Sequence, residues 1–427
     1  MHVLRELSIV ACLLLVACSA PVMQGTPEQS PQQQQTPQSA KPIVIGNLAD
    51  VTGSFALNGA EMHIATDLAL AQINAAGGIN GRPLQVQYAD PKSDPTEATQ
   101  LATQFVQQDN VDVLVGAVSS AECAAVEDLA PRLGIVYVSQ AGCASDDFTS
   151  KSCNKYTFRV LPTGPQLITP LAAYLVQTYG KRWAVMYPDY AFGQSQLRAY
   201  QAGITAAGGS VPVTIAVPLG EANVTPYVSR VPTDGSVDGL VSTFSGADEA
   251  HVDSIILQFG LNGRLPIVGG GTKEHYGGVY PATLDGTVNA SAELSDAPAD
   301  NAFAQQFDAA FKDMAAKEPD MAGKVGGTDK VVAGQSGYPA YAAIEALKTA
   351  MLASNFTGRD DSQKLISAME TLNTQMGPDF PYGGIQMSAS DHQGASPVYI
   401  YKVTGQQENI LSTIPAAQLP PIGSCQV

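Results

Sequence analysis

The sequence predicts an α/β protein made of two doubly wound lobes, and three observations lead to this fold class. Strand and helix signals alternate from residue 43 to residue 98, and a second alternating series runs from residue 165 to residue 268. The chain has 427 residues, of which 45% are hydrophobic, so it can fill two sizeable cores. Such alternation favours mostly parallel sheets with helices on their faces.

The first series is a β-α-β-α unit, and its boundaries have local causes. Apolar residues recur at helical spacing up to Ala76, and Gly77-Gly78 ends the helix because glycine accepts the left-handed conformation. Asp94 is placed to cap the second helix, whose first turn contains a proline and a glutamate. The elements of this unit are a strand at 43–45, a helix at 59–76, a strand at 84–88 and a helix that begins at Pro95.

Apolar periodicity predicts the later elements in the same way. The predicted strands lie at 111–115, 135–138, 183–186, 211–217, 239–243, 265–268 and 398–401. The predicted helices lie at 120–132, 165–179, 193–207, 248–259, 302–317, 338–352 and 362–372. The second series therefore repeats the architecture of the first without repeating its sequence.

An ordered set of residues in the first unit resembles a known family. The set comprises a loop from Gly53 to Gly59, the run Ile-Asn-Ala-Ala-Gly-Gly-Ile-Asn-Gly at 73–81, and Asp94-Pro95. The whole series resembles the type I periplasmic binding proteins of the leucine/isoleucine/valine-binding family. The resemblance extends from about residue 42 to about residue 403.

The resemblance implies a two-lobed protein with a hinge of three strands that closes over a ligand. The implied N-terminal lobe comprises residues 42–162 and 291–386, and the implied C-terminal lobe comprises residues 163–290 and 387–427. The implied function is to capture a small polar ligand, which is amino acid-like, an amide or an aromatic acid. The protein is expected to act as a monomer and to deliver the ligand to the permease subunits of an ABC importer. The alternative is a sensory ectodomain that reports a ligand to a separate transmembrane signalling protein.

The N-terminus has the shape of a bacterial lipoprotein signal. Residues 1–17 contain an apolar run that is too short to span a membrane permanently, and Leu15-Val16-Ala17-Cys18 has the form of a lipobox. We expect Cys18 to carry the lipid that anchors the chain outside the cytoplasm, on the bacterial cell membrane. Residues 18–41 are rich in proline and glutamine and are expected to form a disordered tether. The alternative is an ordinary signal peptide with a chance cysteine.

Composition and motifs argue against several classes of function. The 39 acidic and 22 basic residues give a formal charge of −17, which phosphate backbones would repel, so no nucleic-acid partner is expected. The histidines do not occur at metal-ligand spacing, and no metal or other cofactor is expected. The run Gly334-Gln335-Ser336-Gly337 differs from a nucleophile elbow by one residue. We therefore expect a binding protein and not an enzyme.

Four cysteines follow Cys18, and an even number in an exported chain favours disulfides. Cys143 and Cys153 flank a short polar loop, which makes their pairing the first expectation. Cys123 then pairs with Cys425 by elimination. The alternative is a bond between Cys123 and Cys143, because both are expected near the same strand ends.

The loop Val118-Ser119-Ser120 is the first candidate ligand site. It follows a predicted strand and opens a helix, and ligands of open α/β sheets collect at the carboxyl ends of strands. Hydroxyls and unpaired amides at a helix start suit a carboxylate. Either serine could instead serve only as the helix N-cap. The family resemblance assigns carboxylate binding to Ser120.

The resemblance also implies ligand contacts at other loops. One set follows the strand at 135–138, where backbone groups of the loop hold the ligand in the family. The other sets face the cleft from both lobes. The implied positions are Ala141, Gly142, Cys143, Phe192, Phe244, Ser245, Asn58, Gly271 and Thr272.

Several of these positions depart from the family pattern. Cys143 replaces a threonine hydroxyl, Phe192 replaces a tyrosine, and Gly271 stands where the family has a glutamate that pairs with the ligand's ammonium group. A buried ammonium group without a partner is strongly destabilised, so the branched-chain amino acid mode does not carry over unchanged. Glu274 could supply the missing acid, whereas Lys273 could favour an anionic ligand.

Overall fold

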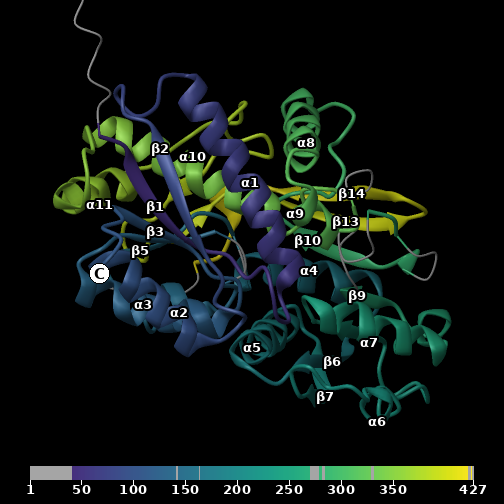
Figure 1. Ribbon diagram of the computed structural model, residues 1–427. Coiled ribbons are helices and arrows are strands. Elements are labelled where there is room, and N and C mark those ends of the chain that lie inside the picture. The colour runs from purple at the N-terminus through teal and green to yellow at the C-terminus, as the bar shows by residue number, and fades with distance from the viewer. Residues whose placement is uncertain are drawn as a thin grey trace, which may run out of the picture. The chain divides into compact units, whose positions relative to one another are not determined.

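The computed structural model describes residues 41–140, 143–162, 164–269, 278–280, 284–327, 331–421 and 425 (Figure 1). Most strands in these ranges belong to two sheets, and helices cover both faces of each sheet. Within the same ranges, none of the helices combines the length and the apolar character that spanning a bilayer requires.

The first sheet has five parallel strands in the order β2-β1-β3-β4-β5. Its strands are β1 (Ile43–Leu48), β2 (Leu84–Ala89), β3 (Val113–Gly116), β4 (Tyr137–Ser139) and β5 (Thr157–Arg159). Helices α1, α8, α10 and α11 pack on one face, and α2 and α3 pack on the other (Figure 1). These helices are α1 (Ala56–Ala75), α2 (Pro95–Gln107), α3 (Ser120–Leu133), α8 (Ala302–Ala315), α10 (Gly337–Ser354) and α11 (Ser362–Glu370).

The second sheet has seven strands in the order β14-β13-β10-β9-β8-β6-β7, of which β13 and β14 are antiparallel to their neighbours. Its strands are β6 (Arg182–Pro188), β7 (Ser210–Val217), β8 (Gly239–Ser242), β9 (Ile267–Gly269), β10 (Val288–Ser291), β13 (Val398–Thr404) and β14 (Gln407–Ile414). Helices α4 (Pro165–Thr178) and α5 (Ala191–Ala206) pack on one face. Helices α6 (Thr225–Val228) and α7 (Ala247–Gln258) pack on the other face.

The strong periodic segments of the sequence form the predicted elements, and the α/β class with two mostly parallel sheets is confirmed. The structure adds β5, β10 and β14, which apolar periodicity did not predict. Apolar and polar residues do not alternate regularly in β14, and its apolar Ile410 and Leu411 are each 42% exposed. Its position follows from pairing with β13, a contact that local sequence does not encode.

The chain passes from the first sheet to the second after β5, and it returns to the first after β10, where α8 packs against the core of α1 and α10. A third passage precedes β13. The short strands β11 (Gln386–Met387) and β12 (Gly394–Ala395) lie just before it and form their own two-stranded sheet. This path has the order that the family resemblance implies, and the residue boundaries of the lobes remain a prediction.

Helix α1 begins earlier than predicted, and Gly59 lies inside its first turns. A Cβ atom at Gly59 would lie 1.9 Å from the backbone oxygen of Asp50, so only glycine lets the helix pack against the loop after β1. At the other end, Gly77 and Gly78 have φ values of +104° and +70°. The predicted glycine stop is therefore confirmed.

The predicted cap of α2 is also confirmed. The Asp94 carboxylate accepts hydrogen bonds from the backbone amides of Thr96 and Glu97 at 2.7 and 2.9 Å. These two bonds hold the pKa of Asp94 below its usual value, as expected for a carboxylate at a helix N-terminus.

The disulfide pairing differs from the first expectation. Cys123 bonds to Cys143, and Cys153 bonds to Cys425. The expected bonds between Cys143 and Cys153 and between Cys123 and Cys425 were wrong. The alternative pairing of Cys123 with Cys143 was correct because α3 and the loop after β4 start from neighbouring strand ends, which places the two Cα atoms 5.5 Å apart.

We expect the double substitution Cys123→Ser/Cys143→Ser to lower the free energy of unfolding by about 3 kcal/mol, because this disulfide closes a loop of about 20 residues. Urea denaturation of both proteins in oxidising buffer measures the difference. Peptide mapping without reductant provides the control, and a peptide that joins Cys143 to Cys153 would contradict the pairing.

Candidate functional site

A cavity with a volume of about 220 Å³ is lined by residues of both sheets and their loops. Its walls include segments that follow β3 and β4 in the first sheet and β6 and β8 in the second, together with Gly269 at the end of β9 (Ile267–Gly269). Ligands of open α/β sheets bind at this edge. The predicted ligand residues that line this cavity are Asn58, Ser120, Phe192, Phe244 and Ser245.

The other predicted positions fall into two groups. Ser119 and Cys143 are buried, but the cavity lining does not include them. The second group lies outside the described residues and comprises Ala141, Gly142, Gly271, Thr272, Lys273, Glu274 and the expected lipidation site Cys18.

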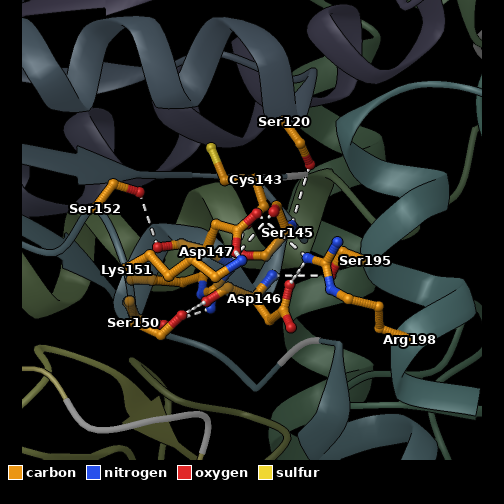
Figure 2. Close-up of polar contacts among 12 residues, drawn as sticks. Ser120, Cys143, Ser145, Asp146, Asp147, Ser150, Lys151, Ser152, Ser195 and Arg198 are labelled. Carbon is orange, nitrogen blue, oxygen red and sulfur yellow. Dashed lines mark hydrogen bonds and ion pairs between the residues drawn. The ribbon is translucent and has the colours of Figure 1, made fainter.

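The two serines at the start of α3 have different contacts. The Ser119 hydroxyl accepts the backbone N–H of Glu122 at 3.2 Å, and the Glu122 carboxylate accepts the backbone N–H of Ser119 at 3.0 Å. This capping box makes Ser119 the N-cap. The Ser120 hydroxyl lines the cavity and accepts the backbone N–H of Ser145 at 3.1 Å (Figure 2). Ser120 is therefore the serine that a ligand can reach.

Two residues with side-chain amides, Asn58 and Gln140, line the cavity. The Nδ2 atom of Asn58 donates to the Ser336 hydroxyl at 2.9 Å, and the Nε2 atom of Gln140 donates to the Thr66 hydroxyl at 2.8 Å. Within the described ranges, the Oδ1 atom of Asn58 and the Oε1 atom of Gln140 are buried without a hydrogen-bond partner. Because buried amide oxygens normally accept a hydrogen bond, both are suited to a ligand that donates.

Two carboxylate side chains also line the cavity, and sequence reasoning missed both. Glu249 lies in the first turn of α7, and Glu293 follows β10; each is 6% exposed. The Glu293 carboxylate accepts the Ser291 hydroxyl at 2.8 Å. The position of Glu249 at a helix start after a strand could have indicated it. No sequence signal indicated Glu293, because β10 itself was not predicted.

Among the cavity-lining residues that the structure describes, one is a lysine or arginine, namely Arg159. Its guanidinium donates to the backbone oxygens of Cys143 and Ser145, the Thr149 hydroxyl and the Gln393 side chain. Burial lowers its pKa to about 10, which still leaves it protonated at neutral pH. Arg159 thus already holds four protein groups, and the other polar side chains of the described lining are hydroxyls, amides and the carboxylates of Glu249 and Glu293.

Aromatic side chains form much of the remaining wall. Tyr190 and Phe192 lie at the start of α5 with ring centroids 5.9 Å apart, and Phe55 and Phe244 line the cavity from the two lobes. Tyr190 was missed, although it lies only two positions before the predicted Phe192. Aromatic faces carry negative partial charge and attract cations.

The loop after β4 contacts α5 through a small polar cluster (Figure 2). The backbone N–H of Asp146 donates to the Ser195 hydroxyl at 2.9 Å. Arg198 forms ion pairs with Asp146 at 2.5 Å and with Asp147 at 3.3 Å. These contacts join the loop that carries Cys143 to the second sheet's helix layer.

Buried carboxyl groups surround α3 in the first lobe. Asp50 and Glu127 are both 0% exposed. Burial raises the pKa of Glu127 to about 8, and burial together with the neighbouring Glu122 carboxylate raises the pKa of Asp50 to about 8. Both side chains are therefore mostly protonated at neutral pH.

Comparison with known proteins supports a binding function. A model of the periplasmic binding protein family matches residues 42–408. The Leu/Ile/Val-binding protein homolog 3 of Brucella melitensis is 26% identical over 333 residues, which cover 77% of this chain and 83% of that protein.

Solved structures share the fold. A periplasmic binding protein from Burkholderia mallei has a TM-score of 0.76 at 20% identity, over 88% of this chain and 96% of that chain. A solute-binding protein of an ABC transporter from Rhodopseudomonas palustris, in complex with 3,4-dihydroxybenzoic acid, has a TM-score of 0.74 at 21% identity, over 88% of this chain and 98% of that chain.

We expect the free energy of unfolding to fall as the pH rises from 5 to 8. A carboxyl whose pKa is raised by folding adds stability that is fully present below its unfolded pKa, near 4, and lost as the pH passes about 8. The slope is about 1.4 kcal/mol per pH unit for each such group. Glu127→Gln should flatten the slope in urea denaturation, and Asp313→Asn, which changes an exposed acid on α8, is the control. An unchanged slope in Glu127→Gln would contradict the assignment.

We expect the double substitution Ser195→Ala/Arg198→Ala to loosen the loop after β4, because it removes one backbone hydrogen bond and two ion pairs. Amide exchange in peptide 143–152 should accelerate about 5- to 30-fold. Hydrogen exchange with mass spectrometry measures this rate. Arg132→Ala, which removes an exposed ion pair on α3, is the control. Equal exchange in the double variant and the parent protein would rule out the contact.

Proposed function

This chain belongs to the periplasmic binding protein family, and we propose that its cavity captures a small solute with an ammonium group. The family consists of binding proteins and not of enzymes. The observation that supports this proposal is the charge of the described residues at the cavity: the carboxylates of Glu249 and Glu293 line it together with one guanidinium, that of Arg159.

The neutral groups of the cavity favour the same ligand. The acceptor oxygens of Asn58 and Gln140 require donors, which an ammonium group supplies. The rings of Tyr190 and Phe192 add faces that attract a cation. A free carboxylate on the ligand can approach the start of α3, where Ser120 lies at the positive end of the helix.

An amino acid-like ligand has both groups that these contacts favour, an ammonium group and a carboxylate. The name of the Brucella melitensis relative refers to branched-chain amino acids, and the Rhodopseudomonas palustris structure contains an aromatic acid. An aromatic acid has no cation to pair with Glu249 and Glu293, and its carboxylate would be repelled by both. We therefore favour an amino acid or amine over an aromatic acid.

Cleft closure is the proposed mechanism. A ligand that contacts Ser120 from one lobe and Phe244 and Glu249 from the other has more contacts when the lobes are together. Its differential affinity for the closed state then shifts the equilibrium toward closure. The closed form would deliver the ligand to the permease subunits of an ABC importer.

The proposed place of action is outside the cytoplasm, with a lipid anchor at Cys18 and a tether up to residue 41. The two disulfides support an oxidising compartment, because such bonds persist in exported proteins and are rare in the cytosol. The chain would act there as a monomer.

We expect amine-bearing probes to stabilise the protein and purely anionic probes to leave it unchanged. A thermal-shift panel of L-leucine, L-lysine, L-glutamine, ethanolamine, benzoate and 3,4-dihydroxybenzoate tests this expectation. A probe at 100 times its dissociation constant adds about 2.7 kcal/mol of stability. Stabilisation by benzoates alone would overturn the proposed ligand class.

Calorimetry on the best amine probe then tests the two carboxylates. Glu249→Gln and Glu293→Gln should each weaken binding about 10- to 100-fold, because each removes a charged partner of the ammonium group. Asp313→Asn, which changes an exposed acid on α8, is the matched control. Wild-type affinity in both glutamine variants would contradict the proposal.

A further inference from the structure

Three side chains with metal-ligating atoms converge on α1, outside the cavity lining. His63 and Asp67 lie one turn apart on α1, so both project from the same face. Glu318 comes from the segment between α8 and α9 (Pro319–Lys324), which packs against α1 (Figure 1). The three side chains are partly buried, with exposures of 19%, 32% and 16%.

The distances between the potential ligand atoms suit a metal ion. The Nε2 atom of His63 lies 3.6 Å from an Asp67 carboxylate oxygen and 3.8 Å from a Glu318 carboxylate oxygen. One atom of each residue lies within 4.8 Å of the other two. Tetrahedral Zn²⁺ with bonds of about 2.0–2.2 Å separates its ligand atoms by about 3.4 Å. Small movements of these side chains would therefore bring their ligand atoms to the spacing of a tetrahedral site.

A tyrosine orients the two ligands on α1. The ring of Tyr88 stacks on the imidazole of His63, with centroids 3.7 Å apart and planes 14° apart. Its hydroxyl donates to the second Asp67 carboxylate oxygen at 2.7 Å. Metal sites commonly use such second-layer hydrogen bonds to hold their ligands in place.

The charge of the cluster lacks compensation in the described part of the chain. Glu318 is the N-cap of α9, yet its carboxylate does not cap that helix. Both of its carboxylate oxygens are buried without a hydrogen-bond partner. No lysine or arginine of the described ranges forms an ion pair with Asp67 or Glu318. Burial and the facing Asp67 carboxylate raise the pKa of Glu318 to about 7.

We propose that His63, Asp67 and Glu318 bind a divalent transition-metal ion, for which Zn²⁺ is the best match, with water completing the shell. Mixed imidazole and carboxylate ligands suit Zn²⁺. The ion would clamp α1 to the segment before α9. Because none of the three residues lines the cavity, the site is independent of the proposed solute.

Calorimetric titration of the metal-stripped full chain with ZnCl₂ tests the site. We expect one Zn²⁺ per chain, a binding signal that His63→Ala and Glu318→Gln abolish, and unchanged binding in His251→Ala, which removes an exposed histidine on α7. Tyr88→Phe keeps the stacked ring but loses the hydrogen bond to Asp67, so it should weaken binding about 10-fold. Absence of binding, or equal binding in His63→Ala, would overturn the proposal.

Two further measurements keep the test decisive if a variant is unstable. Thermal unfolding of each variant in EDTA shows whether it still folds without metal. Addition of Co²⁺ to the wild-type chain should give the visible absorption of a tetrahedral site with nitrogen and oxygen ligands, and equimolar Zn²⁺ should remove it. A spectrum identical to that of Co²⁺ in buffer would overturn the site without reference to any variant.

Discussion

The hydrogen bonds of the buried Arg159 guanidinium hold together the segments on which the cavity depends. Arg159 ends β5 and is 3% exposed. It donates to the loop after β4 at Cys143, Ser145 and Thr149, and to Gln393 in the segment that leads to β13. A buried charge that loses such partners is strongly destabilising. Arg159 therefore fixes the positions of this loop, of the passage after β5 and of the passage before β13 relative to one another.

The disulfide between Cys123 and Cys143 constrains the same loop from the side of α3, and the Ser120 hydroxyl receives the amide of Ser145. A loop held by these three contacts can present backbone groups to a ligand at low entropic cost. The Cys143 side chain supports this loop through its disulfide and does not line the cavity.

Local sequence predicted most of the fold because helix ends and strand alternation have local causes. The Gly77-Gly78 stop and the Asp94 cap are examples, because in both cases residues next to the helix end decide where the helix stops or starts. The family resemblance, and not local pattern alone, assigned Ser120 and Phe192 to the ligand site, and both residues line the cavity. Glu293 was not found, because it follows β10, whose short polar sequence becomes a strand only through pairing with β9 and β13.

By itself, the sequence determined the α/β class, the order of the elements and the family, since these depend on periodicity and on motifs that adjacent residues form. Only the tertiary structure decided which cysteines pair, which charges face the cavity and which side chains surround His63. These properties depend on residues that are far apart in the chain, such as Cys153 with Cys425 or His63 with Glu318. Packing brings them together, and no local pattern records the distance between them.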